Sequence, residues 1–366
     1  MRKYAYHELS LLQYILLIHG TQIGIGVLTL PRELAEHAGT DGWLSMFFGW
    51  GVSVLVSLVI TNMMKLHPDK TITDLLTLLL GKWLGKVASI LMSVYCAIAA
   101  IVVVVNSAFI INVWVLSQTP GYIIFMLFAI PIYIIIQGGL RIIARYSELV
   151  FYLTLWMPLL LAAALKDANW LHFLPIIKEG WQPILSASIY TVLPFLGFEL
   201  AYFVYPFLKK KQHASLGIVV ANTLTLLVYL HVTIICFAFF SPDEIKQYTW
   251  PTLNLWKVIE YSFLERIDII FLAFYLFILS TTVLTYMYFA VFCTTQVFGN
   301  RDHRKHLIVL LLLIFVCLWF YTPSFMDLKK MTDIWSIAGV GFAFVLPVLL
   351  FGPIWLLQRK AGGKKA

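Results

Sequence analysis

The chain has 366 residues, of which 61% are hydrophobic and 12% charged, and its formal net charge is +8. A soluble domain carries about 25% charged residues, because it must cover its core with a wetted surface. The composition therefore excludes an ordinary soluble domain. The basic residues lie in short connections between apolar runs, which argues against a nucleic-acid-binding face and favours the charge bias of a membrane protein.

Long apolar runs recur along the whole chain, each close to the ~20 residues that a helix needs to cross ~30 Å of hydrocarbon. Backbone polar groups need internal partners in hydrocarbon, so these runs must be helices, and the alternating pattern of a membrane barrel is absent. The sequence predicts an all-α polytopic membrane protein, a single integral domain over 1–366 with pseudo-repeats at 9–165 and 185–357. Ten spans are expected, at 9–36, 43–65, 84–116, 121–138, 146–165, 185–207, 216–240, 268–298, 306–322 and 333–357.

The lysines and arginines predict the orientation of these spans. With ten spans, about 18 basic residues fall on the side of the two termini and about 8 on the other side. Such an asymmetry is typical of cytoplasmic termini. Between spans seven and eight, the pattern over 253–263 predicts a short amphipathic helix lying on the membrane. Six tryptophans near span ends are expected to be interface anchors: Trp114, Trp156, Trp170, Trp250, Trp256 and Trp335.

The first span is interrupted by three glycines, Gly20, Gly24 and Gly26, before it ends at Pro31. Glycine lets the backbone leave helical geometry cheaply and lets a ligand approach it closely. A half-helix starting near Ile25 would point its amide end at the gap, which suits a carboxylate.

The sixth span has a second interruption around Pro194 and Gly197, followed by Glu199. Proline cannot donate to the carbonyl one turn earlier, and glycine relaxes the next turn. Each broken span opens one half of the chain. Breaks at matching positions of two halves are a sequence pointer to a binding site between inverted repeats.

Unwinding both helices frees backbone groups that cost several kcal/mol each in lipid unless something binds them. Freed carbonyls could accept from an ammonium group, so a small amphoteric molecule such as an amino acid would satisfy both ends. The alternative is close helix packing, since Gly20 and Gly24 also form a small-xxx-small pair. The candidate ligand-binding residues at the breaks are Thr21, Gln22, Ile23, Gly24, Ile25, Gly26, Phe195, Leu196, Gly197, Phe198 and Glu199.

Glu199 is the most informative single residue, because an ionisable group inside a span is costly and by default marks an ion or substrate path. It could neutralise an ammonium, carry a proton or cap freed amides. The alternative is a structural hydrogen bond. Glu148, near the start of span five, is expected to form an interfacial pair with Arg145.

Spans three and eight are expected to flank the site. Tyr95 and Ala99 lie one turn apart on span three, and Thr282 and Tyr286 lie one turn apart on span eight. A Na⁺ ion could be held by Thr21, Gly24, Thr281 and Thr282, although each hydroxyl could instead bond a carbonyl of its own helix. His19 is expected to be a packing residue.

No catalytic motif is present: the sequence contains no P-loop, no HExxH, no GxSxG and no metal-ligand spacing. We expect a protein that is not an enzyme and that needs no cofactor, apart from Na⁺ or H⁺ if transport is coupled.

The segment Gly20-Thr21-Gln22-Ile23-Gly24-Ile25-Gly26 resembles the unwound first helix of the amino acid–polyamine–organocation transporters. Gly197-Phe198-Glu199 is similar to the break in their sixth helix. Over its whole length the chain more closely resembles the permease-like B subunits of bacterial spore germinant receptors, through the Gln13-Tyr14 start and the run from Pro194 to Glu199.

This resemblance implies the five-plus-five inverted-repeat fold of LeuT-like transporters, with helices one and six broken. It also implies residence in the spore inner membrane, assembly with an A subunit and a lipoprotein C subunit, and sensing of a nutrient such as an amino acid. Proton-coupled relatives use a lysine in span five, whereas Lys166 lies at the end of that span here. Three hypotheses follow: a ligand-sensing subunit, an autonomous amino-acid transporter coupled to Na⁺ or H⁺, and a structural scaffold.

Overall fold

The computed structural model describes residues 8–259, 266–299 and 302–362. Within these ranges the chain is built of helices, and the only strand-like pairing is an isolated bridge between Leu9 and Leu208. The prediction of an all-α fold is confirmed.

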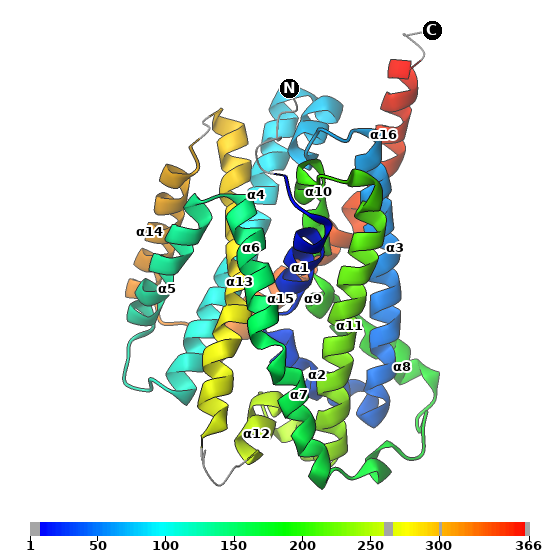
Figure 1. Cartoon of the computed structure of the whole chain (residues 1–366), viewed down its shortest axis with the longest axis vertical. Coiled ribbons are helices and arrows are strands. Elements are labelled where there is room, and N and C mark those ends of the chain that lie inside the picture. The colour runs from blue at the N-terminus through cyan, green and yellow to red at the C-terminus, as the bar shows by residue number, and fades with distance from the viewer. Residues whose placement is uncertain (1–7, 260–265, 300–301, 363–366) are drawn as a thin grey trace.

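The first half of the chain supplies the first five predicted spans (Figure 1). Span one is divided between two helices, and span five continues from one helix into the next. In order the helices are α1 (Leu11–Gln22), α2 (Gly26–Ala38), α3 (Ser45–Leu66), α4 (Ile72–Trp114), α5 (Gly121–Gln137), α6 (Leu140–Thr154) and α7 (Trp156–Leu161).

The second half supplies the remaining five. Span six is made of short pieces: α8 (Trp181–Ala187), η5 (Ser188–Thr191), α9 (Val192–Phe195), η6 (Phe198–Leu200), α10 (Ala201–Val204) and η7 (Tyr205–Phe207). It is followed by α11 (Ala214–Phe239), α12 (Pro251–Val258), α13 (Ile267–Phe298), α14 (Arg304–Phe320) and α15 (Phe325–Gly339). A π-helical segment, η10 (Val340–Val345), joins α15 to α16 (Leu346–Gly362).

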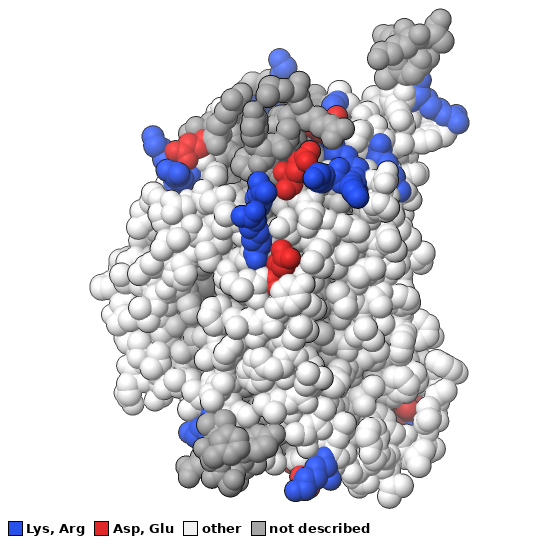
Figure 2. All heavy atoms as spheres, in the orientation of Figure 1, with Lys and Arg blue, Asp and Glu red and all other residues white. Residues whose placement is uncertain are grey.

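Six helical stretches of the described chain are long and apolar enough to cross a membrane, and the bent pair Trp181–Phe195 and Phe198–Phe207 makes a seventh. The predicted spans beyond these are shorter: α1 with 12 residues, which completes span one, α5 with 17 and α14 with 17. Charged side chains gather at the two ends of the molecule, and the broad band between them is mostly free of charge on the visible face (Figure 2). The protein is an integral membrane protein.

The orientation of the spans is not tested by the structure. Several residues behind the charge asymmetry lie outside the described ranges, namely Arg2, Lys3, Arg301, Lys364 and Lys365.

Helix α1 lies inside the bundle, surrounded by longer helices (Figure 1). It packs against α6, α11 and α13, while α4 and α13 run alongside each other. Its start is fixed by a capping box, in which Ser10 Oγ accepts from the amide of Gln13 and Gln13 Oε1 accepts from the amide of Ser10, both at 3.1 Å. Helix one therefore has a defined start.

Two expectations about the periphery need correction. Trp250, Trp256 and Trp335 are buried, so they are packing residues and not interface anchors. The predicted amphipathic helix is present as α12, but it packs into the protein, where Thr252 Oγ1 donates to the carbonyl of Val27 at 2.7 Å. The rest of that segment, 260–265, lies outside the described residues. A sequence pattern near a span end does not tell whether lipid or another helix covers the aromatic face.

Candidate functional site

Helix one ends at Gln22, and the helical path resumes at Gly26. Ile23 takes an extended conformation with φ −78° and ψ 96°, so the hydrogen-bond ladder stops there. No side chain caps the start of α2 at Ile25. The amide end of a helix of 13 residues therefore faces the interior of the bundle without a capping side chain, as the sequence predicts.

Two threonines of α13 donate hydrogen bonds to the carbonyls released by this break. Thr281 Oγ1 donates to Gly20 O at 2.6 Å, and Thr282 Oγ1 lies 3.1 Å from Thr21 O and 3.3 Å from Ile23 O. Both threonines were predicted to face helix one, and the structure brings them together with it. Unpaired carbonyls in the membrane interior are costly, so these hydroxyls stabilise the unwound segment.

Two tyrosines that the sequence analysis did not select bind the remaining carbonyls. Tyr229 Oη of α11 donates to Gln22 O at 3.1 Å, and Tyr275 Oη of α13 donates to Gly24 O at 2.6 Å. Tyr275 precedes Thr282 by seven residues, two helical turns, so both lie on the same face of α13. That spacing was available in the sequence and could have identified it.

The break in span six lies directly against the break in span one. Helix α9 ends at Phe195, Leu196 is extended with ψ 142°, and Gly197 has φ 127°, which L side chains rarely adopt. A Cβ at Gly197 would lie 3.0 Å from Gln22 Cγ and 3.2 Å from the carbonyl carbon of Thr21. Gln22 Nε2 donates to Phe195 O at 2.8 Å. The two interruptions therefore form one region.

A buried polar network holds Gln22 in place from the α11 side. Gln22 Nε2 also lies 2.9 Å from Asn222 Oδ1, and Thr225 Oγ1 donates to Gln22 Oε1 at 2.8 Å. His19 Nδ1 lies 3.0 Å from Thr225 Oγ1, so this histidine is part of the packing around the break. Asn222 and Thr225 were missed, although an amide inside the apolar run 216–240 is an unusual residue in a span.

Glu199 follows the break in span six, in the short helical turn after Gly197, and only 3% of its surface is exposed. Its Oε1 accepts from Tyr95 Oη at 2.7 Å and from Tyr286 Oη at 2.6 Å. Its Oε2 accepts from the amide of Gly197 at 2.7 Å. Three side chains selected from separate spans are thus in direct contact. Glu199 caps a freed amide, one of the three roles considered for it.

The π-helical segment of span ten forms the wall behind this cluster. Phe342 stacks on Tyr95 with ring centroids 4.7 Å apart, and Phe344 meets Phe198 edge-on at 5.2 Å. Trp335 meets Tyr286 edge-on at 5.8 Å. Sequence reasoning missed this wall because a π-helical turn has no simple sequence signature, although such turns are frequent at functional sites.

The remaining predicted residues lie around the same region. Ala99 is fully buried one turn after Tyr95 on α4. A Cβ at Gly26 would lie 2.9 Å from Tyr229 Oη and 3.2 Å from Pro194 Cγ, so only glycine fits there. A side chain at Gly339 would collide with Leu196. The two breaks and span ten are therefore in close contact.

A small cavity reaches the break in span one, and Glu199 is not among the residues that line it. Its volume is about 110 Å³, and its walls come from α1, α2, α6, α7, α11, α12 and α13. Gly20, Ile23 and Val27 line it together with Phe151 and Tyr275. Because a water molecule occupies ~30 Å³ of liquid, a space of this size holds a group of a few heavy atoms. It is lined mainly by apolar side chains, which suits an aliphatic group.

The structure also allows the predicted Na⁺ site to be assessed. Thr21, Gly24, Thr281 and Thr282 do lie close together. Thr281 Oγ1 lies within hydrogen-bond distance of Gly20 O and of Ile278 O in its own helix, and Thr282 Oγ1 lies within that distance of Thr21 O. Thr21 Oγ1 donates to Leu17 O at 2.7 Å. A cation would need these oxygens as ligands. A donating hydroxyl keeps lone pairs for a cation, so the Na⁺ site remains a prediction. In the described chain no group of three or more His, Cys, Asp or Glu side chains could hold another metal.

Glu148 is farther from the break and has a different partner from the one expected. Gln13 Nε2 lies 3.4 Å from Glu148 Oε2, whereas Arg145 points to the exposed surface. The expected pair with Arg145 is wrong, because helix α1 brings Gln13 against the buried side of α6.

A model of the family described as spore germination protein matches residues 8–326 of the chain. The chain belongs to the spore germination protein family. It is 28% identical to spore germination protein A2 of Bacillus subtilis (strain 168), over 96% of this chain and 97% of that protein. It is 26% identical to spore germination protein B2 of the same organism, over 99% of both chains, and 24% identical to GerQB of Bacillus cereus, over 96% of both.

Two solved structures show the fold of this family member. MhsT in complex with L-phenylalanine matches with a TM-score of 0.55 at 14% identity, over 94% of this chain and 98% of that one. A mutant of the Eremococcus coleocola manganese transporter matches with a TM-score of 0.57 at 13% identity, over 93% and 78%. The predicted LeuT-like inverted-repeat fold with helices one and six broken is confirmed. The family is permease-like and is not an enzyme family.

Proposed function

We propose that this spore germination protein is a nutrient-sensing subunit that binds a small amphoteric ligand, an amino acid, where its two broken helices meet. The observation that carries the proposal is the hydrogen-bonded cluster of Glu199, Tyr95 and Tyr286 beside the uncapped start of α2. The carboxylate of Glu199 suits an ammonium group, and the amide end of α2 suits a carboxylate.

The contacts at Glu199 suggest how binding changes the protein. An ionised carboxylate offers about four acceptor sites, and three are used here by Tyr95, Tyr286 and Gly197. One acceptor site therefore remains for an ammonium group, and a second hydrogen bond from the ammonium to Glu199 would have to replace a phenol. The released tyrosine would have to move against Phe342 or Trp335 of span ten.

This exchange gives the ligand different contacts in two packings of the bundle, which is what a shift in population requires. The freed carbonyls of the two breaks contribute less than the sequence suggests, because Thr21, Gln22 and Phe195 already accept from protein donors. Each carbonyl has a second lone pair, so a ligand could add to these bonds. The ligand residues predicted from the sequence remain the proposed set.

The signal would pass to partner subunits, an A subunit and a lipoprotein C subunit, in the spore inner membrane. We place both termini in the cytoplasm, on the basis of the basic residues, and the two repeats at 9–165 and 185–357. The relatives, which are named as spore germination proteins, support a role in germination. The protein would act without catalysis. Ligand binding and the interaction with the partner subunits would be linked by a coupling free energy between the two sites.

The deciding experiment is ligand binding to the purified full-length chain, screened across amino acids, sugars and nucleosides by isothermal titration calorimetry. Saturable binding of an amino acid that weakens in Glu199→Gln is the expected result. Binding of sugars or nucleosides alone would refute the proposed ligand class.

A second candidate function is autonomous amino-acid transport, favoured by the transporter fold itself. Reconstituted vesicles holding this chain alone distinguish the two. Accumulation of labelled amino acid under an imposed Na⁺ or proton gradient would support transport, and its absence together with measurable binding would support sensing.

A further inference from the structure

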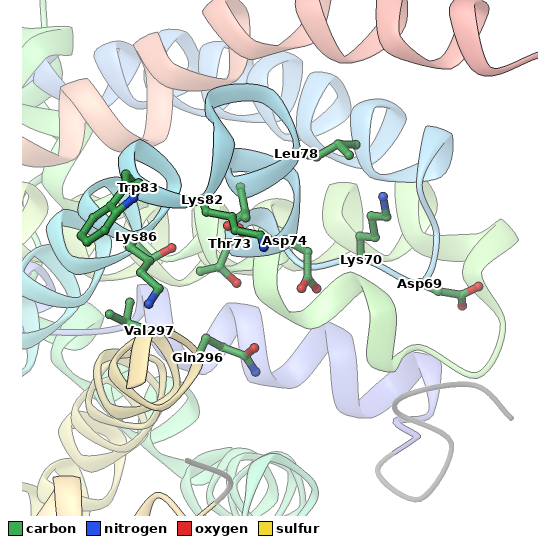
Figure 3. Close-up of a pocket in the computed structure, with 12 residues that line it drawn as sticks. Asp69, Lys70, Thr73, Asp74, Leu78, Lys82, Trp83, Lys86, Gln296 and Val297 are labelled. Atoms are coloured by element: carbon green, nitrogen blue, oxygen red, sulfur yellow. The ribbon is translucent and has the colours of Figure 1, made fainter. Parts of the chain in front are cut away.

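A second, larger cavity lies away from the broken helices, between the start of α4 and the end of α13 (Figure 3). Its volume is about 930 Å³. It is lined by the loop after α3, by both segments of α4 and by α13: Asp69, Lys70, Thr73, Asp74, Thr77, Leu78, Lys82, Trp83, Lys86, Ser89, Gln296 and Val297.

The shape of this cavity follows from a break in α4. Gly81 has φ 81°, so the segment 72–80 turns away from the long helix that continues to Trp114. A Cβ at Gly85 would lie 2.5 Å from Thr77 Cα, which shows how closely the two segments approach. The first segment thus forms a fixed wall at the point where the long helix begins.

The charge available to a ligand in this cavity is positive. Lys82 and Lys86 are four residues apart on the same face of α4, and Figure 3 shows Lys86 reaching toward the end of α13, where Gln296 lies. Lys70 lines the cavity from the preceding loop. In the part of the chain that the structure describes, none of the three forms an ion pair.

The acidic and hydroxyl groups of the cavity already have protein partners. Asp74 accepts from the amide and from Oγ1 of Thr71, both at 3.0 Å, and Asp69 pairs with Lys211 at 2.8 Å. Thr77 Oγ1 and Ser89 Oγ donate to carbonyls of their own helix at 2.9 and 2.8 Å. Lys211 offsets the charge of Asp69, and Asp74 keeps its negative charge, against which the lining sets the three lysines. The lysines are therefore the groups left for an anion.

An exposed apolar surface adjoins these lysines. Trp83 is 86% exposed, Leu84 61% and Val87 53%, on the helix that carries Lys82 and Lys86. Tryptophan next to basic residues at a span end is typical of the membrane–water interface. The cavity therefore opens where the headgroups of the bilayer meet its hydrocarbon.

We propose that this cavity binds the headgroup phosphate of an anionic phospholipid, phosphatidylglycerol being the simplest example. Lys70, Lys82 and Lys86 would neutralise the phosphate, and the acyl chains would lie along Trp83 and the apolar face beside it. Basic cavities between spans at the cytoplasmic surface are suited to anionic lipid headgroups. A free phosphate would use the lysines but would leave the apolar face uncovered.

The test is the affinity of fluorescent phosphatidylglycerol for the purified full-length protein in detergent, measured by anisotropy, with labelled phosphatidylcholine as the neutral probe. At about 1 kcal/mol for each lysine near the surface, Lys82→Gln/Lys86→Gln should weaken phosphatidylglycerol binding about 25-fold. Lys82→Arg/Lys86→Arg should keep the affinity within about threefold, since the charge is preserved.

The matched control is Lys209→Gln/Lys210→Gln, which removes two exposed charges from a loop that does not line the cavity. It should leave the affinity unchanged, and unfolding temperatures should agree among all variants. Equal weakening in the control would show unspecific surface attraction and overturn the proposal. Displacement of the lipid by equimolar inorganic phosphate, or equal affinity for both labelled lipids, would also overturn it.

Discussion

The hydroxyl of Tyr286 on α13 lies 2.6 Å from Oε1 of Glu199, which belongs to the short helical turn after the break in span six. Tyr95 on α4 donates to the same oxygen. A helix pair that runs side by side through the bundle, α4 and α13, is thereby tied to the one carboxylate next to both broken helices. Glu199 is therefore in direct contact with both of these long helices.

Replacing Glu199 by glutamine should therefore change ligand response far more than the same change at Glu148. The amide keeps the size of the side chain, but its NH₂ group cannot accept from a phenol or from the amide of Gly197. Loss of one hydrogen bond to a charged group costs about 1.5–3 kcal/mol. We expect at least a tenfold loss of ligand affinity for Glu199→Gln by calorimetry.

The control for that experiment is Glu148→Gln, since Glu148 has a single long contact at 3.4 Å with Gln13. It should bind ligand as the natural protein does. Equal tolerance of both changes would remove Glu199 from the site.

Gly24→Leu should abolish ligand binding without preventing membrane insertion. A Cβ at Gly24 would meet only Thr282 Oγ1, at 3.8 Å, which is an ordinary contact, so the backbone tolerates a side chain there. A leucine extends farther and would fill the space at the break. Gly24→Ala is the matched control and should retain binding. Ligand binding by the leucine variant, measured in the same calorimetric experiment, would refute the placement of the site.

Much of this site could be predicted because rare residues mark it. Glycine and proline in the middle of a span, and one carboxylate in an apolar run, stand out in any membrane sequence. Tyr286 could be selected by its helical spacing from Thr282, and Tyr95 together with Ala99, one turn later on span three. Tyr275 lies two turns before Thr282 and could have been selected in the same way, whereas Tyr229 looks like an ordinary aromatic residue of a span until the direction of its helix face is known.

The wall formed by span ten could not be predicted at all. Phe342 and Phe344 are two residues apart, and a regular α-helix would point them in different directions. Both residues lie in the π-helical turn Val340–Val345, where one ring stacks on Tyr95 and the other meets Phe198. Burial of Trp335 likewise depends on which helix packs against it, and a position near a span end gives no information on this.

Gly197→Ala should destabilise the protein through the backbone. Its φ of 127° is a conformation that costs an L residue about 1–3 kcal/mol, and the new Cβ would lie 3.0 Å from Gln22 Cγ. The expected result is a lower unfolding temperature in detergent, measured by tryptophan fluorescence. Gly51→Ala is the control, because Gly51 lies within helix α3 with open space at its Cβ position. It should be neutral or slightly stabilising, and a similar loss in both variants would contradict the strained break.

Thr282→Val tests whether hydroxyls of α13 hold the unwound segment of helix one. Valine has nearly the same shape, but it cannot donate to Thr21 O and Ile23 O, which then lose a partner in the membrane interior. Leaving a buried acceptor unsatisfied costs about 1–3 kcal/mol. The variant should unfold at lower temperature, and the backbone amides near Ile23 should exchange hydrogen faster with solvent.

The matched variant is Thr285→Val, in which the lost hydroxyl donates at 2.7 Å to Thr281 O of its own helix. That carbonyl keeps its place in the α-helical ladder, so the change should have little effect on exchange at helix one. Adding Na⁺ tests the alternative, in which the Thr282 hydroxyl ligates a sodium ion. If Thr282 only bonds carbonyls, the difference in unfolding temperature between natural protein and Thr282→Val is independent of Na⁺. A difference that grows with Na⁺ concentration would mean that the hydroxyl also ligates the cation.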